Sequence, residues 1–523
     1  MNTMRKESRR GARSWALALG LCLAGPLALL AAPPEAPPPK GPAPITVRIH
    51  GETLKLPNGM TFVLVQRPGA PTFAGYIGFR VGGVDTVPGD TGLAHMFEHM
   101  AFKGTQHIGT TDWAKEKPLY EALEKAGDEL TLMRAEGKGT PEQRAALAEK
   151  VKELSREEHR YIKKDEFDYW YTLAGERAEN ASTSEDLTQY YVMLPSNALE
   201  LWMLMESQRI REPVLREFYS ERSVIEQERL MRTDNDPMGK LYEQFEATAF
   251  MAHPYRLPTI GWASDVRALT MAKAQAFFHE YYSPSNAVGV LVGNFDVAQA
   301  KRWIAEFFGT IPRRGDPPPI VTKEPKQEEE RRIQVAFDAH PQMLMGWHKP
   351  TWPSPGDTRM DIISNLLTDG VTSRLYRRLV EEDHLVLEVQ SWNDDPGARY
   401  DNLFVIQASP NEGVPYEKVE KAITEEIDRL KTEPVSAAEL EKAKTRILAS
   451  YLRRLDSTLS TAQLVGATQL ITGDWHNIEI YLQQVQAVTP QEIQKTAAAY
   501  LTTGNRTVAT LVKPPQAGKE AQR

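Results

Sequence analysis

The chain has 523 residues, of which 41% are hydrophobic and 25% charged, so it is long enough for two to four domains of ordinary soluble composition. Its net charge is −8, its pI is about 5.9, and no basic patch is interleaved with aromatic residues. This composition argues against nucleic-acid binding. The chain contains one cysteine, Cys22, so it cannot depend on internal disulfides.

The first 32 residues have the pattern of an export signal. A positively charged stretch (5–13) precedes an apolar run (15–30), and cleavage after Ala32 is expected. The run is shorter than the roughly 20 residues that span a bilayer, which disfavours a permanent transmembrane helix. No later stretch is long and apolar enough to span one either. We therefore expect an exported, periplasmic protein, attached to a membrane only if Cys22 carries a lipid.

Two histidines four residues apart follow in the first half of the chain. On a helix with 3.6 residues per turn, His95 and His99 lie one above the other, so both rings can reach one ion. Zinc lowers the pKa of a bound water to about 7, and a carboxylate beside it, such as Glu98, can take the remaining proton as the water attacks a carbonyl. The order His-x-x-Glu-His therefore predicts a zinc hydrolase site. The alternative is a helix with two surface histidines.

The flanks of this motif are more specific than the motif itself. Residues 92–105 read Gly-Leu-Ala-His-Met-Phe-Glu-His-Met-Ala-Phe-Lys-Gly-Thr and resemble the signature of the pitrilysin/insulinase family of zinc metallopeptidases, the inverzincins, almost letter for letter. The chain resembles the bacterial two-domain type, which is related to mitochondrial processing peptidase. The resemblance covers nearly all of residues 45–513. It implies a zinc endopeptidase with one Zn²⁺ per chain, acting on peptides or unfolded protein segments.

The segment 112–168 is rich in charged residues and makes this part of the chain longer than the family usually has. Apolar residues recur every three or four positions in two stretches separated by Gly137–Gly139. Thr140 would cap the second stretch, with Pro141 at its first helical position. We expect an inserted helical hairpin, which could contact a partner or simply decorate the surface.

Residues 180–190 match the family's Asn-Ala-x-Thr-Ser-x-Asp-x-Thr-x-Tyr segment. In relatives this segment forms a sheet edge beside the metal, and the substrate pairs with it as an added strand. The resemblance therefore implies that Asn180 and Ala181 bind substrate. Considered without the family, the stretch is a polar turn entering a helix, with Thr183 or Ser184 as its cap.

Two glutamates further along can share one helix face. Glu221 and Glu228 are seven residues apart, about two helical turns. The family places its third metal ligand at the second glutamate of such a pair, after a hydrophobic doublet like Val224-Ile225. The resemblance therefore implies Glu228 as the third ligand and Glu221 as a supporting carboxylate. The alternative is the solvated side of an amphipathic helix.

An internal repeat divides the chain into two halves. The same three residues recur at the same spacing before a strand-like run in each half, as Thr270, Tyr281 and Asn286 and again as Thr489, Tyr500 and Asn505. Each copy indicates a helix, a turn and a buried strand. With the resemblance, the expected fold is α+β: two homologous domains, each a mixed β-sheet with packed helices, enclosing a chamber. The expected parts are a signal peptide (1–32), a proline-rich segment (33–44), a zinc-bearing domain (45–312), a linker (313–331), an inactive domain (332–514) and a tail (515–523).

The second half lacks the metal residues. Sliding it against the first half places Ile362, Asn365 and Leu366 where the first half has the two histidines and the glutamate of the motif. In this half, single-chain relatives carry an arginine and, seven residues later, a tyrosine that hold the substrate. The corresponding residues here are Val380 and Leu387.

The missing arginine and tyrosine suggest a partner. Some bacterial members of the family are heterodimers, and the resemblance implies a homologous metal-free subunit that supplies both residues. The other explanation is a different register, in which Arg374, Arg377 or Arg378 takes the role. The alternative function is a non-catalytic structural or assembly subunit of the same fold.

Overall fold

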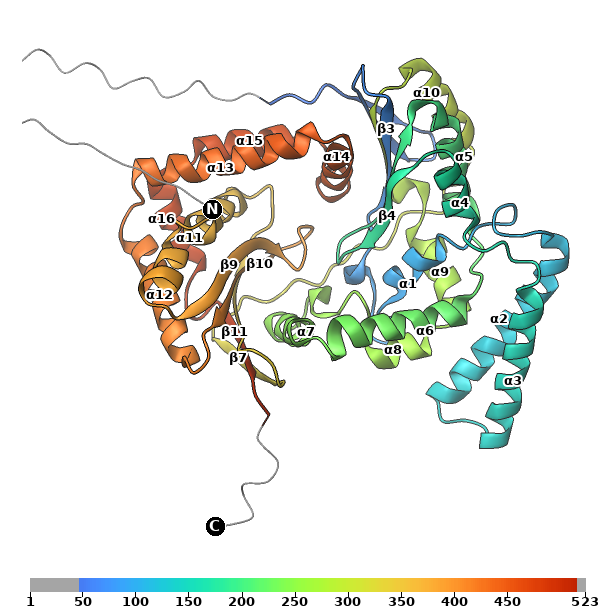
Figure 1. Cartoon of the computed structure of the whole chain (residues 1–523), viewed down its shortest axis with the longest axis horizontal. Coiled ribbons are helices and arrows are strands. Elements are labelled where there is room, and N and C mark those ends of the chain that lie inside the picture. The colour runs from blue at the N-terminus through green and yellow to red at the C-terminus, as the bar shows by residue number, and fades with distance from the viewer. Residues whose placement is uncertain (1–46, 515–523) are drawn as a thin grey trace, which may run out of the picture. The chain divides into compact units, whose positions relative to one another are not determined.

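The computed structural model describes residues 47–514. The expected export signal, the proline-rich segment, Cys22 and the tail lie outside the described residues. The described chain is built on two mixed β-sheets with packed helices, so the predicted α+β class is confirmed (Figure 1). None of the helices within 47–514 is both long and apolar enough to cross a membrane.

The first sheet has six strands in the order β1-β2-β6-β3-β5-β4. They are β1 (Glu52–Lys55), β2 (Thr61–Gln66), β3 (Thr72–Phe79), β4 (Arg177–Thr183), β5 (Thr188–Pro195) and β6 (Ala287–Gly293). Strands β2 and β6 pair in parallel, and the other neighbours are antiparallel. Strand β4 is the last strand of the sheet, so its outer backbone groups are not used by this sheet.

The second sheet repeats this arrangement with one strand fewer, in the order β7-β11-β8-β10-β9. Its strands are β7 (Arg331–Ala336), β8 (Met343–Lys349), β9 (Val386–Asp395), β10 (Asn402–Pro410) and β11 (Arg506–Val512). Again the pair that joins distant segments, β7 and β11, is parallel and the rest are antiparallel. Strand β9 therefore corresponds to β4, at the free edge.

Helices fill the connections between the strands. Those of the first half are α1 (Leu93–Met100), α2 (Trp113–Ala135), α3 (Pro141–Glu158), α4 (Glu166–Leu173), α5 (Leu199–Arg211), α6 (Phe218–Arg229), α7 (Pro237–Ala249), α8 (Ala263–Ala268), α9 (Met271–Tyr281) and α10 (Val297–Trp303). Those of the second half are α11 (Pro355–Thr368), α12 (Tyr416–Thr432), α13 (Ala437–Asp456), α14 (Thr458–Thr472), α15 (Asn477–Ala487) and α16 (Pro490–Tyr500).

The repeated residues make equivalent hydrogen bonds in both halves. Thr270 caps α9 and Thr489 caps α16, each accepting a backbone hydrogen bond three residues on. The amide of Asn286 donates to the carbonyl of Tyr281 at 2.9 Å, and that of Asn505 donates to the carbonyl of Tyr500 at 2.8 Å. Each asparagine thus ties the end of a helix to the strand that follows, β6 or β11. The sequence repeat is a structural repeat.

Each sheet is covered on one face by helices of its own half and on the other by a helix of the opposite half (Figure 1). Helix α14 packs on β3 and β6, and α7 packs on β7 and β11. The contact with α14 is close: a Cβ added at Gly466 would lie 2.2 Å from the ring of Tyr76. The two halves therefore bury each other's apolar surface, and neither has a complete core by itself.

The segment 112–168 contains the expected helical hairpin, α2 and α3. Thr140 and Gln143 form a capping box at the start of α3, with Pro141 at its first position. Helix α2 buries an apolar stripe against the first half, whereas α3 buries only Glu158. The outer helix of the hairpin is therefore solvated on nearly all sides.

A buried ion pair joins this hairpin to α6. Nε of Arg216 lies 2.5 Å from Oε1 of Glu116, and neither side chain is exposed at all. The same guanidinium donates to the carbonyls of Lys103, Thr105 and Ile108. Arg216 therefore fixes the chain just before α6 against the end of α1 and the start of α2.

Replacing this arginine should destabilise the whole chain. In Arg216→Met, Glu116 is left buried without a partner, and we expect the free energy of unfolding to fall by about 3–5 kcal/mol. Urea unfolding followed by circular dichroism measures the loss. The control is Arg313→Met, which breaks an exposed pair with Asp316 and should cost less than about 0.5 kcal/mol. Equal losses of unfolding free energy in the two variants would contradict a special role for the buried Arg216–Glu116 pair.

Candidate metal centre

Helices α1 and α6 bring three possible metal ligands to one point. Oε2 of Glu228 lies 3.5 Å from Nε2 of His95 and 3.6 Å from Nε2 of His99. The two imidazole rings are nearly perpendicular, at 88°, with centroids 4.9 Å apart. In residues 47–514, this is the one group of three or more His, Cys, Asp or Glu side chains whose ligand atoms all lie within 4.8 Å of one another.

These separations fit a tetrahedral zinc ion. Two ligand atoms bound about 2.0–2.1 Å from zinc at a tetrahedral angle lie roughly 3.3–3.4 Å apart. The two carboxylate–imidazole separations, 3.5 and 3.6 Å, need only small side-chain shifts, and all three ligand atoms lie within 4.8 Å of one another. Two imidazole nitrogens and one carboxylate oxygen also form a donor set typical of catalytic zinc, because they leave a fourth position open for water.

The carboxylate of Glu221, which is also bonded to Lys103, orients the ring of His99. Oε2 of Glu221 lies 3.3 Å from Nδ1 of His99, and its other oxygen lies 2.5 Å from Nζ of Lys103. Burial opposes ionisation, but the hydrogen bonds from His99 and Lys103 prevail and lower the pKa of Glu221 to about 2. An ionised acceptor at Nδ1 holds the proton there, so Nε2 of His99 presents its lone pair to a metal.

The first histidine is held neutral by its surroundings. Burial, together with the nearby His99 and Arg232, lowers the pKa of His95 to about 3. Neutral imidazole is the form that binds metal, so burial of this ring favours a ligand role. Arg232, itself largely exposed, contacts Oε1 of Glu228 at 3.0 Å and leaves Oε2 to the histidines.

Glu98 lies at the end of the free edge strand. Oγ1 of Thr183, the last residue of β4, donates to Oε2 of Glu98 at 2.5 Å. Burial raises the pKa of Glu98, and the hydrogen bond from Thr183 partly offsets this. The carboxylate expected to act as a base is therefore anchored through one oxygen to the sheet edge.

The segment around Asn180 and Ala181 is a strand. Both residues lie in β4, opposite Tyr191 and Tyr190 of β5. The interpretation of this stretch as a turn entering a helix is wrong, because residues 184–187 form the turn between two antiparallel strands. The side chain of Asn180 is exposed and accepts a hydrogen bond from the backbone of Ala181 at 2.8 Å.

Another buried arginine fixes the end of α6. Nη2 of Arg229 lies 2.6 Å from Oε2 of Glu243 on α7, and Nη1 donates to the carbonyl of Gly261 at 2.7 Å. Because Arg229 is adjacent to Glu228, this pair sets the position of the third possible ligand. Sequence reasoning missed Arg229, Lys103 and the contact of Thr183 with Glu98. Lys103 and Thr183 lie within the quoted motifs, whereas no local pattern marks Arg229.

The second half offers no matching ligands. Ile362 and Leu366 of α11 are buried in its apolar core. Val380 packs against the same core, and Leu387 is exposed on β9. The three arginines of the other register are each paired with glutamates of the second half: Arg374 with Glu439, Arg377 with Glu382, and Arg378 with Glu425 and Glu426.

Sequence comparison finds relatives of this chain that are named zinc proteases. A family profile described as "Peptidase M16 inactive domain" matches residues 268–447, a stretch that contains none of the three possible ligands. The chain is 29% identical over 432 residues to "Zinc protease PqqE" of Helicobacter pylori, covering 81% of this chain and 83% of that protein. It is 24% identical over 484 residues to an "Uncharacterized zinc protease" of Mycobacterium leprae, covering 89% and 92%.

Solved structures agree with the sequence relatives. A protease from Helicobacter pylori is similar with a TM-score of 0.75 and 26% identity, over 89% of this chain and 99% of that one. The first half of the periplasmic protease PqqL from Escherichia coli shares the fold, with a TM-score of 0.64 and 15% identity over 90% and 94%. With its two similar sheets, its match to an M16 domain profile and its zinc-protease relatives, the chain is similar to peptidases of the M16 family and has the architecture of a pitrilysin-like two-domain protein.

Proposed function

We propose that this protein is a zinc-dependent endopeptidase that hydrolyses peptides or unfolded protein segments. The observation that carries the proposal is the convergence of Nε2 of His95, Nε2 of His99 and Oε2 of Glu228, with Glu98 next to them on α1. The names of the relatives, which are zinc proteases, support the same conclusion. One ion per chain is expected, because the second half has no equivalent residues.

The residues around this point have separate chemical roles in the proposed reaction. A zinc ion held by the three ligands would act as a Lewis acid and would lower the pKa of a bound water. Glu98 accepts the proton released when water adds to the peptide carbonyl, at Oε1, the oxygen not bonded to Thr183. It then returns that proton to the leaving nitrogen as the C–N bond breaks, so one water is consumed and Glu98 is regenerated.

The free edge of β4 supplies the substrate contact in this proposal. An extended peptide can add to it as a further strand next to Asn180 and Ala181, with the end of the strand at Thr183 and Glu98. Backbone groups are common to all peptides, so such pairing suits an enzyme that accepts many sequences. The leader-like first 32 residues, and the similarity to a protein titled a periplasmic protease, support a periplasmic location.

A homologous metal-free subunit completes the enzyme in this proposal. Val380 and Leu387 cannot act as the arginine and tyrosine of single-chain relatives, and the nearby arginines are engaged by glutamates. The ligands of the first half are all present, so the missing function is substrate clamping rather than metal binding. These observations favour a zinc-bearing subunit over a purely structural one.

Removing the third ligand should remove the metal. In Glu228→Gln, we expect zinc to fall from about one ion per chain to a small fraction, because two histidines alone do not complete a zinc site. Atomic absorption after dialysis measures the content. The control Glu226→Gln changes the same charge on the same helix outside the ligand cluster, and should retain zinc. Full zinc content in Glu228→Gln would overturn the proposal.

Removing the base should separate metal binding from catalysis. In Glu98→Gln, zinc content should remain about one ion per chain while kcat falls by about 10²–10⁴-fold, the usual contribution of a general base. Turnover of a quenched fluorescent peptide measures the rate. Unchanged turnover in Glu98→Gln would show that another group is the base. If the unmodified chain shows no hydrolysis at all, with or without a partner subunit, the chain is the non-catalytic alternative.

The partner proposal predicts a difference between the isolated chain and the pair. The purified chain should bind zinc but cleave peptides slowly, and adding a metal-free homologue that carries the arginine and tyrosine should raise kcat/KM at least about tenfold. A homologue with both residues replaced is the matched control. Normal turnover by the isolated chain, unchanged on addition of the homologue, would exclude the heterodimer.

A further inference from the structure

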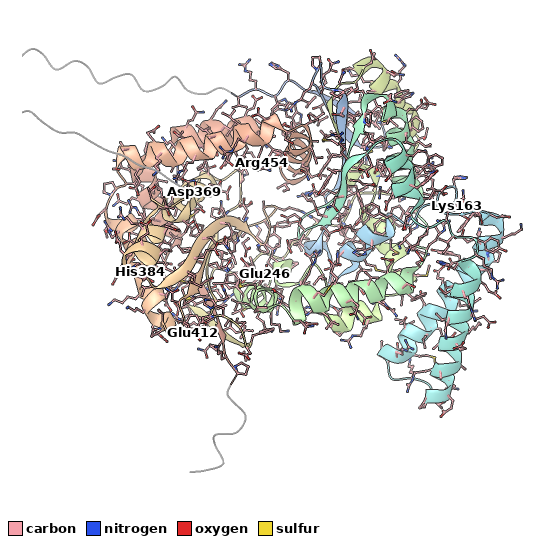
Figure 2. The ribbon with its side chains drawn as sticks, in the orientation of Figure 1. Lys163, Glu246, Asp369, His384, Glu412 and Arg454 are labelled. Carbon is pink, nitrogen blue, oxygen red and sulfur yellow. The ribbon has the colours of Figure 1, made fainter. Side chains whose placement is uncertain are left out.

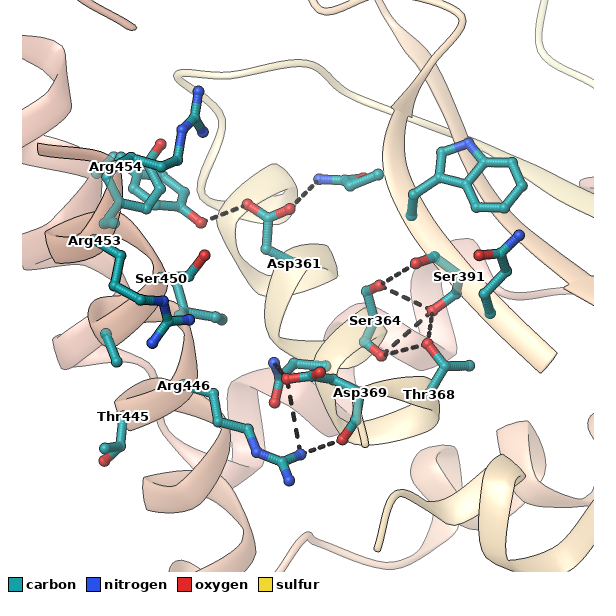
Figure 3. A pocket seen from close by; sticks show the side chains of 18 residues that line it. Asp361, Ser364, Thr368, Asp369, Ser391, Thr445, Arg446, Ser450, Arg453 and Arg454 are labelled. Atoms are coloured by element: carbon teal, nitrogen blue, oxygen red, sulfur yellow. Dashed lines mark hydrogen bonds and ion pairs between the residues drawn. The ribbon is translucent and has the colours of Figure 1, made fainter. Parts of the chain in front are cut away.

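A polar cavity of about 820 Å³ lies among α11, β9 and α13 of the second half (Figure 3). Asp369 and Arg454 mark its place in the molecule (Figure 2). Helix α11 follows β8 as α1 follows β3, and β9 is an edge strand like β4. The cavity therefore occupies the position in the second sheet that the candidate metal centre occupies in the first.

The cavity is lined by three arginines of α13, which are not equally engaged. Nη1 of Arg446 lies 3.7 Å from Oδ2 of Asp369 and also donates to the backbone carbonyl of that residue. Arg453 and Arg454 have no ion-pair partner within residues 47–514, and the guanidinium of Arg454 lies over the ring of Tyr451 at 5.7 Å. Two cations are thus available to a ligand.

The opposite wall of the cavity carries hydroxyl groups. Oγ of Ser391 on β9 lies 2.9 Å from Oγ of Ser364 and 2.7 Å from Oγ1 of Thr368, both on α11. Figure 3 shows the arginines of α13 on one side and this hydroxyl cluster on the other. Hydroxyl and guanidinium groups both donate hydrogen bonds to oxyanions.

The acidic groups of the cavity are already satisfied. Oδ2 of Asp361 accepts from the hydroxyl of Tyr481 at 2.8 Å, and its other oxygen accepts from the amide of Asn393 at 3.1 Å. Asp369 is engaged by Arg446. Among the residues that line the cavity, two carboxylates face three guanidinium groups beside a free strand edge. Asp357 and Asp394, which line the adjoining pocket with Arg454, are both engaged by Lys349.

We propose that this cavity is a recognition site for carboxylate groups of an extended peptide that adds to the edge of β9. The inference rests on the proposed peptidase function and specifies its substrate class: acidic peptides. Arg453 and Arg454 contact the carboxylates, and the edge of β9 pairs with the backbone. Planar guanidinium groups suit this role, because each can form two parallel hydrogen bonds to one carboxylate.

A contact between two turns connects this cavity to the candidate metal centre. The turn after β4 contacts the turn after β9, where Oδ2 of Asp186 accepts from the backbone of Ala398 at 2.6 Å and of Arg399 at 3.0 Å. A path of nine residues runs through this contact, three from Thr183 to Asp186 and six from Ala398 to Trp392. At about 3.3 Å per residue, these nine steps span at most about 30 Å, and the contact itself adds the length of the Asp186 side chain and one hydrogen bond. One peptide chain can therefore reach both sites.

The test uses the full chain with Glu98→Gln, which prevents cleavage during binding. The probe is an 18-residue dansylated, amidated peptide, uncharged apart from two glutamates near each end, and fluorescence anisotropy gives its Kd. It is compared with the same peptide carrying glutamines, and with the glutamine peptide ending in a free carboxylate. We expect the glutamate peptide to bind about tenfold more tightly than the amidated glutamine peptide, and this preference to disappear in Arg453→Gln/Arg454→Gln.

The matched control is Arg377→Gln/Arg429→Gln, which removes two charges of the second half outside the cavity. It should keep the preference, and all variants should keep the midpoint of thermal unfolding. A preference for the free carboxylate alone, lost with the same two arginines, would support the site and identify the peptide terminus as its ligand. A preference that survives in Arg453→Gln/Arg454→Gln, or that disappears in the control, would overturn the inference.

Failure of this inference is distinguishable from failure of the proposed function. Cleavage by the unmodified chain without any arginine-dependent preference would remove the carboxylate site and leave the peptidase. An arginine-dependent preference without Glu98-dependent cleavage would remove the peptidase, and with it the substrate role assigned to this cavity.

Discussion

The position of α6 relative to α1 is the constraint on which the site depends. Glu228 is brought to His95 and His99 from more than 100 residues away, so no local geometry can place it. Two buried arginines at the ends of α6 do so: Arg216 with Glu116, and Arg229 with Glu243. Separating a buried ion pair leaves an unpaired buried charge at a cost of about 3–5 kcal/mol, so these two pairs disfavour arrangements of the helices in which the partners are apart.

The second half contributes to the candidate metal centre although it holds none of the three possible ligands. Helix α14 covers the face of the first sheet that is not covered by helices of the first half, and the buried pair between Arg399 and Asp85 joins the two halves. The turn after β4 is held by backbone donors at 398–399. The end of β4 carries Thr183, which holds Glu98, so the position of the expected base depends on contacts made by the second half.

Sequence reasoning was strong where the information is local and weak where it is long-range. The spacing of His95 and His99 and the capping of α3 follow from helix periodicity and side-chain chemistry, and the structure shows both. Glu228 could be singled out among several glutamates only through the family resemblance. The roles of Arg216 and Arg229, and the exchange of α7 and α14 between the sheets, could not be predicted, because they depend on contacts between residues far apart in sequence.

The two sheets show how one scaffold can support two kinds of recognition. Both halves place a helix beside a free strand edge, but one lines that place with imidazoles and carboxylates and the other with guanidinium and hydroxyl groups. Metal coordination acts over a few ångströms and depends on buried, rigid ligands, whereas attraction between charges extends over a Debye length of about 8 Å and tolerates mobile side chains. The exposed Arg453 and Arg454 of α13 therefore suit capture of a peptide, whereas the buried His95 and the partly buried His99 of α1 suit the proposed hydrolysis of one of its bonds.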